Sequence, residues 1–410
     1  MDLRPLEGRR FWFVGIGGAG MSALALVAHA WGAEVDGSDR ARSSYVERLE
    51  AAGIQVVIGH DAASVPEGAE VVVSSAVGED NPELEVTRAR DTKTLRRGEL
   101  LAEFVAMRPS IVVAGAHGKT TTTGMIAFVL DRLGLDPAFL IGGEIPQLDG
   151  NARAGEGWLV AEGDESDRSL ELLRPRIAVL TNVDLDHHAT FASENEVREL
   201  FDRWLAVAPE VVRGDGLEPV DLGLAVAGEH NRRNAAVALA ALELAGVERR
   251  DAERVLPEFA GVGRRLERRG EVRGVAVYDD YGHHPREIAA TLAAARVVAG
   301  SGRVLVLFQP HLYSRTRHLA HGLAHALAAA DAVAVTSVYA AREEPVAGVE
   351  GRLVVEALAA ERPGMPLAWT PELEDAVRFV ARRVRPGDLV LTIGAGDIER
   401  AGPLLLEELA

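Results

Sequence analysis

The sequence predicts an α/β protein with parallel sheets, and two observations support this. Short runs rich in Val and Ile alternate with helical stretches rich in Ala and Leu from Phe11 to about Thr392, which is typical of strands joined by crossover helices. At three separate places, a strand is followed by a glycine-rich turn or a polar cluster: residues 11–20, 111–121 and 304–310. Three such places favour three successive sheet domains over a single large one.

The length and composition agree with several domains. A chain of 410 residues is too long for one ordinary compact core. With 48% hydrophobic and 26% charged residues, it has the composition of an ordinary globular protein. We place the boundaries near Pro109 and Val262, which gives domains of residues 1–108, 109–262 and 263–410.

The composition also excludes several classes of partner. A formal net charge of −18 argues against broad nucleic-acid or anionic-membrane surfaces, since both need clustered Lys and Arg. No run approaches the roughly 18–20 apolar residues of a spanning helix, and the first residues, Met1 to Pro5, lack an apolar signal core. We therefore expect a cytoplasmic protein. Because the chain has no cysteine, any metal must be held by oxygen or nitrogen ligands.

The first domain is expected to begin with half of a Rossmann-like fold. A strand at residues 10–14 is followed by a glycine-rich turn, a helix through His29 and a second strand at 33–35 that leads to Asp39. The turn reads Gly15-Ile16-Gly17-Gly18-Ala19-Gly20. Backbone N–H groups at such a turn suit a pyrophosphate. With Asp39 about 20 residues further on, the pattern by itself suggests NAD, but no hydride-transfer site is identifiable elsewhere, which favours another pyrophosphate ligand.

The second domain is expected to open with a strand at residues 111–114 and a phosphate loop. The loop reads Val113-Ala114-Gly115-Ala116-His117-Gly118-Lys119-Thr120-Thr121 and precedes an apolar helix at 125–133. A phosphate loop needs small residues at which backbone N–H groups approach phosphates, a lysine for the β- and γ-phosphates, and a hydroxyl for Mg²⁺. Gly118, Lys119 and Thr120 supply these groups, although Val113 stands where the general motif has its first glycine. The alternative is a glycine turn followed by a threonine-rich helix cap.

Two acidic clusters follow the phosphate loop, each at the end of an expected strand. The strand at 158–161 leads to Glu162-Gly163-Asp164-Glu165-Ser166-Asp167, and the strand at 177–180 leads to Thr181-Asn182-Val183-Asp184-Leu185-Asp186-His187-His188. Because ligands gather beyond the carboxyl ends of parallel strands, both clusters should face the phosphate loop. Oxygen ligands together with substrate phosphates suit Mg²⁺. Either cluster alone fits a solvated acidic loop, whereas both together after a phosphate loop predict metal binding.

In the order of its motifs, the sequence resembles the Mur ligases over nearly the whole chain. The motifs are Gly15-Ile16-Gly17-Gly18-Ala19-Gly20-Met21, Ser74-Ser75-Ala76, Asn81-Pro82-Glu83, His117-Gly118-Lys119-Thr120-Thr121-Thr122-Thr123, Asp164-Glu165-Ser166-Asp167, Gly228-Glu229-His230-Asn231, Gly263-Arg264-Arg265, Asp279-Asp280-Tyr281-Gly282-His283-His284-Pro285, Phe308-Gln309-Pro310-His311 and Gly394-Ala395-Gly396-Asp397-Ile398. Each motif alone is weak, but their order is specific. Within the family, the likeness is to the enzymes that join L-alanine to the carboxylate of UDP-N-acetylmuramate. It implies a Rossmann-like domain for the UDP-sugar, a central phosphate-loop domain for ATP, and a Rossmann-like third domain.

The resemblance implies a site for ATP and Mg²⁺ in the central domain. Lys119 would bind the transferring phosphate, Thr120 and Glu162 would hold one Mg²⁺, and His187 would hold a second. The loop residues expected to contact ATP are Gly115, Ala116, His117, Gly118, Lys119, Thr120 and Thr121. Four further residues match positions that contact the nucleotide or bring the third domain onto it: Asn231, Asn234, Arg265 and Asp280. For these four, the alternative is a capped helix or a surface ion pair, which the residue types alone leave open.

The resemblance also implies sites for the two other substrates. The residues expected at the UDP-sugar are Gly15, Gly17, Gly18, Ala19, Gly20, Asp39 and Ser74. The residues expected at the amino acid are His283, His284, His311, Arg315 and Arg317. An arginine fork suits a small carboxylate. Without the resemblance, a metal site and a structural network would explain this histidine and arginine cluster equally well.

The implied reaction begins when the muramate carboxylate attacks the γ-phosphate of ATP. It gives an acyl phosphate, which the amine of alanine then displaces. Catalysis would come from positioning and from neutralisation of charge on the transferring group by Lys119 and Mg²⁺. The partners would be small molecules only, UDP-N-acetylmuramate and L-alanine, and the protein would be a monomer or a homodimer.

The sequence departs from the family pattern in two places. The stretch at 201–227 is distinctly shorter than the family normally has, so we expect a shortened central domain. Leu312 follows His311 where the family commonly has arginine, which bears on the choice of amino acid. The alternatives are a recycling ligase that adds a tripeptide to the same UDP-sugar, a folate-polyglutamate-type ligase, which does not share the first-domain glycine turn, and a noncatalytic UDP-sugar-binding or regulatory ATPase.

Overall fold

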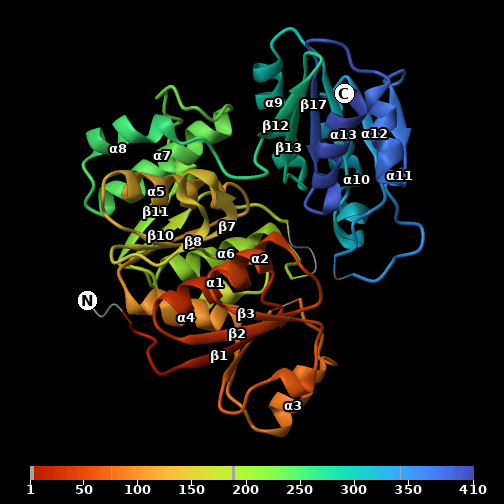
Figure 1. The fold of residues 1–410 in the computed structure, drawn as a ribbon. Helices are drawn as coiled ribbons and strands as arrows, with labels where there is room; N and C mark the ends of the chain where they lie inside the picture. The colour runs from red at the N-terminus through yellow and green to blue at the C-terminus, as the bar shows by residue number, and fades with distance from the viewer. Residues whose placement is uncertain (1–3, 75, 187–189, 342) are drawn as a thin grey trace. The chain divides into compact units, whose positions relative to one another are not determined.

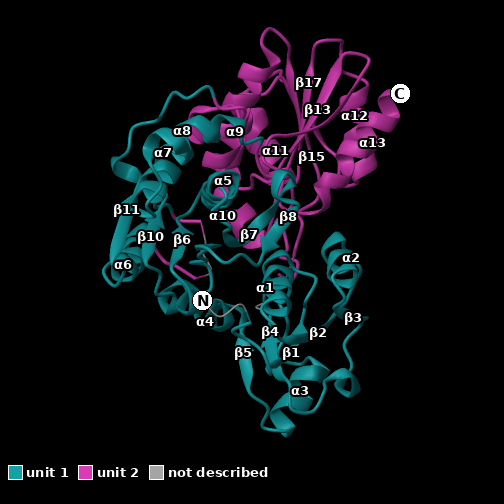
Figure 2. Cartoon of the chain, turned by 60° about the vertical axis from the view of Figure 1, so that its left-hand side comes forward, with its two compact units in different colours: residues 1–184, 194–223, 233–260 teal, residues 185–193, 224–232, 261–410 magenta. Residues whose placement is uncertain are grey.

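The structure is a computed structural model that describes the chain except for residues 1–3, 75, 187–189 and 342. The described residues form three β-sheets with helices packed on them (Figure 1). They divide into two compact units (Figure 2). The first unit contains residues 1–184, 194–223 and 233–260, and the second contains residues 185–193, 224–232 and 261–410. The first two sheets therefore belong to the first unit, and the third sheet belongs to the second.

The first sheet has five parallel strands in the order β3-β2-β1-β4-β5. The strands are β1 (Arg10–Val14), β2 (Glu34–Asp39), β3 (Gln55–Ile58), β4 (Glu70–Val73) and β5 (Thr94–Arg96). The helices are α1 (Ala19–Ala30), α2 (Ser44–Ala51), η1 (Ala62–Ser64), α3 (Pro82–Ala89) and α4 (Arg97–Met107). After the exposed Arg10, β1 is an apolar run from Phe11 to Val14, as expected for a strand that pairs along both edges and is buried there. Asn81 caps α3 by accepting from the backbone N–H of Glu83, and Pro82 begins that helix.

The second sheet has six strands in the order β11-β10-β6-β9-β7-β8. Its strands are β6 (Ser110–Ala114), β7 (Ala138–Ile145), β8 (Gly150–Arg153), β9 (Leu159–Glu162), β10 (Ile177–Leu180) and β11 (Glu210–Arg213). All pairs are parallel except the β7–β8 hairpin. The helices are α5 (Lys119–Arg132), η2 (Pro146–Leu148), η3 (Ser169–Leu172), α6 (Glu194–Leu205), η4 (Gly214–Gly216), α7 (Glu229–Leu244), α8 (Arg249–Val255) and η5 (Leu256–Glu258). The central strand β6 is buried at every position, as a strand covered on both faces should be.

The third sheet has six strands in the order β12-β13-β17-β14-β15-β16. Its strands are β12 (Glu267–Val272), β13 (Val275–Asp280), β14 (Val304–Phe308), β15 (Ala332–Val335), β16 (Leu367–Trp369) and β17 (Leu389–Ile393), of which only β12 pairs antiparallel to its neighbour. The helices are α9 (Pro285–Ala299), α10 (Tyr313–Leu327), α11 (Arg352–Glu361), α12 (Leu373–Ala381), η6 (Asp397–Arg400) and α13 (Ala401–Leu409). Alternate residues of β14 enter two separate cores, one with α9, α10 and α11 and the other with α12 and α13. Helices therefore cover both faces of this sheet.

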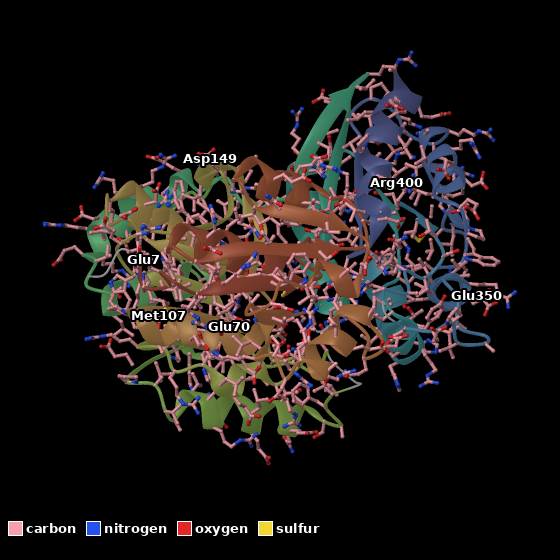
Figure 3. All side chains as sticks on the ribbon, turned by 60° about the horizontal axis from the view of Figure 1, so that its bottom comes forward. Glu7, Glu70, Met107, Asp149, Glu350 and Arg400 are labelled. Atoms are coloured by element: carbon pink, nitrogen blue, oxygen red, sulfur yellow. The ribbon has the colours of Figure 1, made fainter. Side chains whose placement is uncertain are left out.

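The first sheet domain packs on the second through α1, which contacts β7 and β8. The buried Asn151 of β8 donates through Nδ2 to the backbone oxygen of Ala19, at 3.0 Å. Arg48 of α2 donates to the backbone oxygen of Asp149, a residue labelled in Figure 3 that lies in the turn of the β7–β8 hairpin. No described helix is both long and apolar enough to cross a bilayer.

The predicted three-domain α/β architecture is confirmed. Strands predicted at residues 10–14 and 177–180 have those bounds in the structure, and the strand expected within residues 304–310 is β14, at 304–308. The start predicted for the helix at 125–133 was wrong, because α5 begins six residues earlier, at Lys119. A run of four threonines has low helix propensity and obscures the first turn of this helix in the sequence. The domain boundaries near Pro109 and Val262 stay predictions.

Candidate functional site

The phosphate loop joins the end of β6 to the start of α5. It turns at two glycines with positive φ, Gly115 at +128° and Gly118 at +79°, which are conformations that residues with a Cβ rarely adopt. Gly118 is the residue immediately before α5 and has no side chain to cap the helix. The backbone N–H groups of the first turn of α5 are therefore available for an anion.

Residues that follow β10 hold the loop from the side. Thr181 donates through its hydroxyl to the backbone oxygen of His117 at 2.7 Å, and Asn182 donates through Nδ2 to the same oxygen at 2.9 Å. Asn182 Oδ1 accepts from the backbone N–H of His117 at 2.9 Å. Asp184 lies 3.1 Å from His117 Nε2 and fixes the ring. Thr181, Asn182 and Asp184 of the second acidic cluster thus lie against the phosphate loop, as their position after a strand predicts.

Lys119 lies at the centre of the site. Its Nζ atom donates to the backbone oxygen of Gly115 at 2.5 Å and lies 3.1 and 3.2 Å from the two carboxylate oxygens of Glu165. Burial alone would lower the pKa of Lys119, but the carboxylates of Glu165 and Asp164 outweigh that effect and raise the pKa above its ordinary value. Lys119 is therefore a fixed positive charge inside the loop.

Thr120 and Glu162 place a hydroxyl and a carboxylate next to each other at the phosphate loop. The Thr120 hydroxyl donates to Glu162 Oε2 at 3.1 Å, and Glu162 Oε1 accepts from the backbone N–H of Gly142 at 2.5 Å. A hydroxyl and a carboxylate at a phosphate loop suit a hard divalent cation that keeps several waters. These two side chains fit the predicted metal site. The third predicted ligand, His187, lies outside the described residues.

The two predicted asparagines lie on α7 and are both 8% exposed. A Cβ placed on Gly118 would meet the side chain of Asn234, so the absence of a side chain at Gly118 makes room for this amide. Asn231 donates through Nδ2 to the backbone oxygen of Ala227 at 2.7 Å. The structure thus places Asn234 directly beside the phosphate loop.

The glycine turn of the first domain lies at the carboxyl edge of the first sheet. The backbone N–H groups of Gly15 and Ile16 donate to the backbone oxygen of Ser38 at 2.8 and 2.9 Å. Asp39 accepts through Oδ2 from the backbone N–H of Gly17 at 2.8 Å, and Ser74 lies against Gly15. Strands β1, β2 and β4 therefore each contribute to the turn, while Gly18, Ala19 and Gly20 lead into α1. The structure thus brings Gly15, Gly17, Asp39 and Ser74 together at the end of β1, with Gly18, Ala19 and Gly20 next in the chain.

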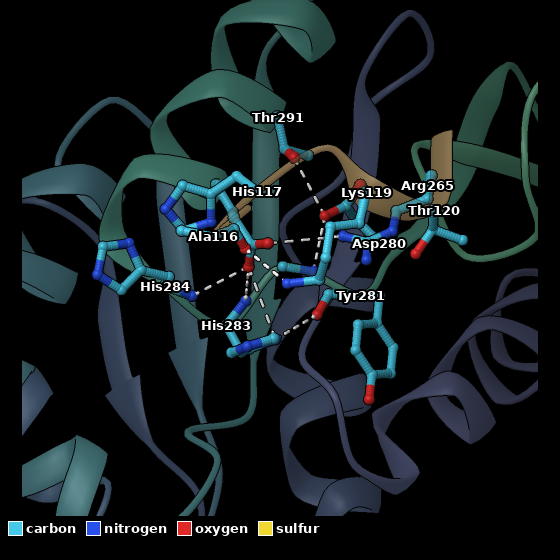
Figure 4. Close-up of polar contacts among 12 residues, drawn as sticks. Ala116, His117, Lys119, Thr120, Arg265, Asp280, Tyr281, His283, His284 and Thr291 are labelled. Atoms are coloured by element: carbon cyan, nitrogen blue, oxygen red, sulfur yellow. Dashed lines mark hydrogen bonds and ion pairs between the residues drawn. The ribbon is translucent and has the colours of Figure 1, made fainter. Parts of the chain in front are cut away.

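In the second unit, the Asp280 carboxylate is buried, and both of its oxygens accept hydrogen bonds. It accepts from the backbone N–H groups of Leu266 and Gly282, both at 2.8 Å. It also accepts from the Thr291 hydroxyl at 3.1 Å (Figure 4). Burial raises the pKa of Asp280, and the nearby Arg265 guanidinium opposes that rise. Asp280 thus fixes the backbone on the C-terminal side of Arg265.

The segment around Arg265 is held in an unusual backbone conformation. Arg264 and Leu266 have φ values of +58° and +49°. The Arg264 side chain donates to Asp279 at 2.8 Å and to the backbone oxygen of Gly394 at 2.7 Å. These bonds offset the cost of the left-handed conformations. Sequence reasoning missed this positioning role of Arg264, although it had noted the Gly263-Arg264-Arg265 motif.

The predicted amino-acid residues are only partly brought together. Arg315 donates to Asp186 at 2.9 Å and lies 2.8 Å from His311 Nδ1, and His283 Nε2 lies 3.6 Å from the same aspartate. His284 instead caps α9, and Arg317 is exposed. The sequence placed Asp186 only within the second acidic cluster predicted to bind metal and did not indicate its contact with Arg315.

Three segments of the chain match domains of one family. Residues 10–108 match the Mur ligase family, catalytic domain, residues 113–204 match the Mur ligase middle domain, and residues 264–396 match the Mur ligase, glutamate ligase domain. Together these segments span most of the chain.

Full-length relatives and solved structures agree with these matches. A UDP-N-acetylmuramate–L-alanine ligase of Renibacterium salmoninarum is 41% identical, and the alignment covers 98% of this chain and 96% of the relative. One of Rubrobacter xylanophilus is also 41% identical, covering 97% and 99%. The crystal structure of a UDP-N-acetylmuramate–alanine ligase from Thermotoga maritima has a TM-score of 0.84 at 27% identity, covering 97% of this chain and 98% of that one.

The comparison with the Renibacterium relative also bears on chain length. The alignment has 453 positions, whereas 98% of 410 residues is about 402, so about 50 positions have no counterpart in this chain. A shortened chain was expected from the stretch at 201–227. Where the missing positions fall stays a prediction.

Proposed function

Because the chain belongs to the Mur ligase family, we propose that it joins L-alanine to the carboxylate of UDP-N-acetylmuramate with hydrolysis of ATP, a step in making peptidoglycan precursors. The observation that carries this proposal is the 41% identity, over almost the full length of both chains, to proteins named for that activity. The phosphate loop supports it, since Lys119, Thr120 and Glu162 lie together at the carboxyl ends of parallel strands.

The central domain is proposed to bind ATP through the loop and to position its γ-phosphate. Lys119 supplies the positive charge that stabilises the transferring phosphate, and the first turn of α5 supplies backbone N–H groups. Thr120 and Glu162 are the proposed ligands of Mg²⁺, with His187 holding a second ion. When bound, Mg²⁺ neutralises charge on the phosphates. Among the distant structural relatives, a Mur ligase from Thermotoga maritima was solved with ADP.

The UDP-sugar site is proposed in the first domain, and the amino-acid site is proposed in the third. The first turn of α1, after the glycine turn, would bind the pyrophosphate of the UDP-sugar, and Asp39 and Ser74 would contact other parts of the same ligand. From the family resemblance, four further residues are proposed to bind ATP: Arg265 and Asp280 of the third domain, and Asn231 and Asn234 of α7. The amine of alanine would then attack the acyl phosphate formed from the muramate carboxylate and displace phosphate.

Arg315 is the strongest candidate for binding the carboxylate of alanine. Its guanidinium is 5% exposed and already pairs with Asp186, so it is held rigidly by a carboxylate. His283 and His311 lie beside it. Arg317, on the exposed face of α10, is a weaker candidate. Leu312, with φ of +67°, occupies the position where the family commonly has arginine.

We propose that the protein works in the cytoplasm as a monomer or homodimer with small-molecule partners only. Its formal net charge of −18 disfavours nucleic acid and anionic membranes as partners. ATP and UDP-sugars are anions, so they require local cationic or N–H-rich sites, such as Lys119 with the first turn of α5.

The proposed function is tested by measuring ADP release with each substrate omitted in turn. We expect ADP release to require both UDP-N-acetylmuramate and L-alanine, and we expect an amide product with one alanine per ADP. A panel of other amino acids and the recycling tripeptide should give much lower rates. ADP release without any amino acid would instead indicate a regulatory ATPase, and preference for the tripeptide would indicate the recycling ligase.

Substitution at Gly118 tests the shape of the loop separately. Gly118→Ala forces a Cβ against Asn234, whereas Gly134→Ala places a Cβ at a similar φ of +72° with no atom within 4 Å. Both variants should lose about 1 kcal/mol of stability from the left-handed backbone. Only Gly118→Ala should also lower kcat/KM for ATP, by about 10- to 100-fold, because the phosphate is misplaced. Melting curves and steady-state kinetics measure the two effects, and equal kinetics in the two variants would contradict the proposed loop.

A further inference from the structure

A cluster of three side chains in the first domain has no role in the function proposed above. Ser38 near the end of β2, His60 just after β3 and Glu83 at the start of α3 meet at the carboxyl edge of the first sheet. The Ser38 hydroxyl lies 2.6 Å from Glu83 Oε2 and 3.1 Å from His60 Nδ1. His60 Nδ1 lies 3.4 Å from the same carboxylate oxygen. Ser38 and Glu83 are fully buried, whereas the His60 side chain is 22% exposed.

These contacts determine which nitrogen of His60 carries a proton. The Glu83 carboxylate only accepts, and it also receives the backbone N–H of Asp61 at 3.4 Å. Ser38 has one hydroxyl proton, which the 2.6 Å contact directs to Glu83. Ser38 Oγ must then accept from His60 Nδ1, so Nδ1 is the protonated nitrogen. In the neutral ring, Nε2 is therefore an acceptor, and no group among the described residues bonds to it.

Ser38 links this cluster to the proposed pyrophosphate site. Its backbone oxygen accepts the N–H groups of Gly15 and Ile16, while its hydroxyl contacts His60 and Glu83. The next residue, Asp39, accepts from Gly17. Successive side chains of a strand point to opposite faces of the sheet. At the end of β2, the Asp39 side chain therefore contacts the glycine turn, while the Ser38 side chain contacts His60. His60 is thereby held at the same edge of the sheet as the glycine turn.

We propose that His60 Nε2 accepts a hydrogen bond from the nucleoside of the UDP-sugar, and that Ser38 and Glu83 are positioning residues that hold the imidazole in the accepting tautomer. This inference rests on the proposed function. The nucleoside offers two kinds of donor, the ribose hydroxyls and the imide N–H of uracil. Because a buried carboxylate and a hydroxyl restrain the ring, little side-chain freedom is lost when the nucleoside binds.

The test uses a variant of His60 that loses the acceptor at Nε2 but keeps an N–H group near the position of Nδ1. His60→Asn removes the outer acceptor but keeps an amide N–H near the position of Nδ1, so the bonds to Ser38 and Glu83 can persist. His29→Asn, at an exposed histidine of α1, is the matched control. Calorimetric titration with UDP should show about 3- to 10-fold weaker binding for His60→Asn and no change for His29→Asn. In the ligase assay, the KM for UDP-N-acetylmuramate should rise by the same factor, with the KM values for ATP and alanine unchanged.

Two UDP analogues identify the donor. If a ribose hydroxyl is the donor, 2′-deoxy-UDP should bind the wild-type protein more weakly than UDP, and if the imide is the donor, 3-methyl-UDP should. In His60→Asn, the affected analogue and UDP should bind equally, because the acceptor is gone. His60→Gln, which places an amide oxygen near the position of Nε2, should restore part of the affinity.

The outcomes distinguish this inference from the proposed function. If the wild-type protein binds UDP and forms the amide while His60→Asn binds UDP equally tightly, the cluster is only structural and the inference is overturned, whereas the ligase function stands. If the wild-type protein does not bind UDP, both are overturned. Matching melting temperatures for the wild type and His60→Asn exclude unfolding as the cause of weaker binding. If His60→Asn does not fold, equal UDP affinity of Glu83→Gln and the wild type would overturn the role given to the cluster.

Discussion

Replacing Lys119 by alanine is expected to abolish most of the ATP-dependent activity. The ammonium group is held inside the loop by the backbone oxygen of Gly115 and by Glu165, where it can stabilise charge on a transferring phosphate. Loss of one such charge-stabilising group lowers kcat by about 100- to 1,000-fold. Phosphate release measured with saturating substrates reports this effect. Turnover close to that of the wild type would remove the basis for the assigned site.

The chain offers a matched control for this substitution. Lys93 is the only other lysine, and its side chain is 56% exposed and pairs with Glu70 in the first domain. Lys93→Ala should leave kcat unchanged. Because Lys119→Ala also leaves the buried Glu165 without its ammonium partner, Lys119→Arg is a useful second variant that keeps the charge. It should fold but remain impaired, since a planar guanidinium does not replace a compact ammonium.

Replacing Glu162 by glutamine is expected to have the second largest effect. The amide keeps the size of the side chain and can still accept from the backbone N–H of Gly142, but it loses the negative charge beside Thr120. A neutral oxygen is a poorer ligand for a hard divalent cation. We expect kcat to fall by about 100-fold and the Mg²⁺ concentration needed for half-maximal rate to rise.

A titration of activity against Mg²⁺ concentration measures this shift. Glu156→Gln provides the control, because Glu156 is an exposed residue shortly before β9 and is outside the described site. Its Mg²⁺ dependence should match that of the wild type. If Glu162→Gln lowered the rate without any change in the Mg²⁺ requirement, Glu162 would not be a metal ligand.

The strands were the most predictable part of the fold, for a physical reason. A parallel strand buried on both faces leaves an unbroken apolar run, so the bounds of β10 and β14 follow from composition alone. Helix starts depend on local contacts that composition does not reveal. The helix α5 begins at Lys119 because the phosphate loop positions its first turn, although the threonines there have low helix propensity.

The candidate site was predictable only to the level of segments. Both acidic clusters follow strands of the sheet that carries the phosphate loop, so the topology alone indicated that they lie near this loop. Which side chain within a cluster contacts Lys119 depends on rotamers, and the sequence did not indicate Glu165 for that contact. In the same way, Arg315 and Arg317 are two positions apart on α10 and so cannot face the same way. The structure directs Arg315 inward and leaves Arg317 exposed.

The bonds that Thr181 and Asn182 make to the backbone of His117 have a consequence for nucleotide affinity. A flexible loop would lose conformational entropy when it closes around a triphosphate, and that loss would weaken binding. Here the backbone of His117 is fixed through both its N–H and its carbonyl by residues of the neighbouring strand end. The ordering of the loop is thus accomplished during folding, and the favourable contacts to the nucleotide need not compensate for it.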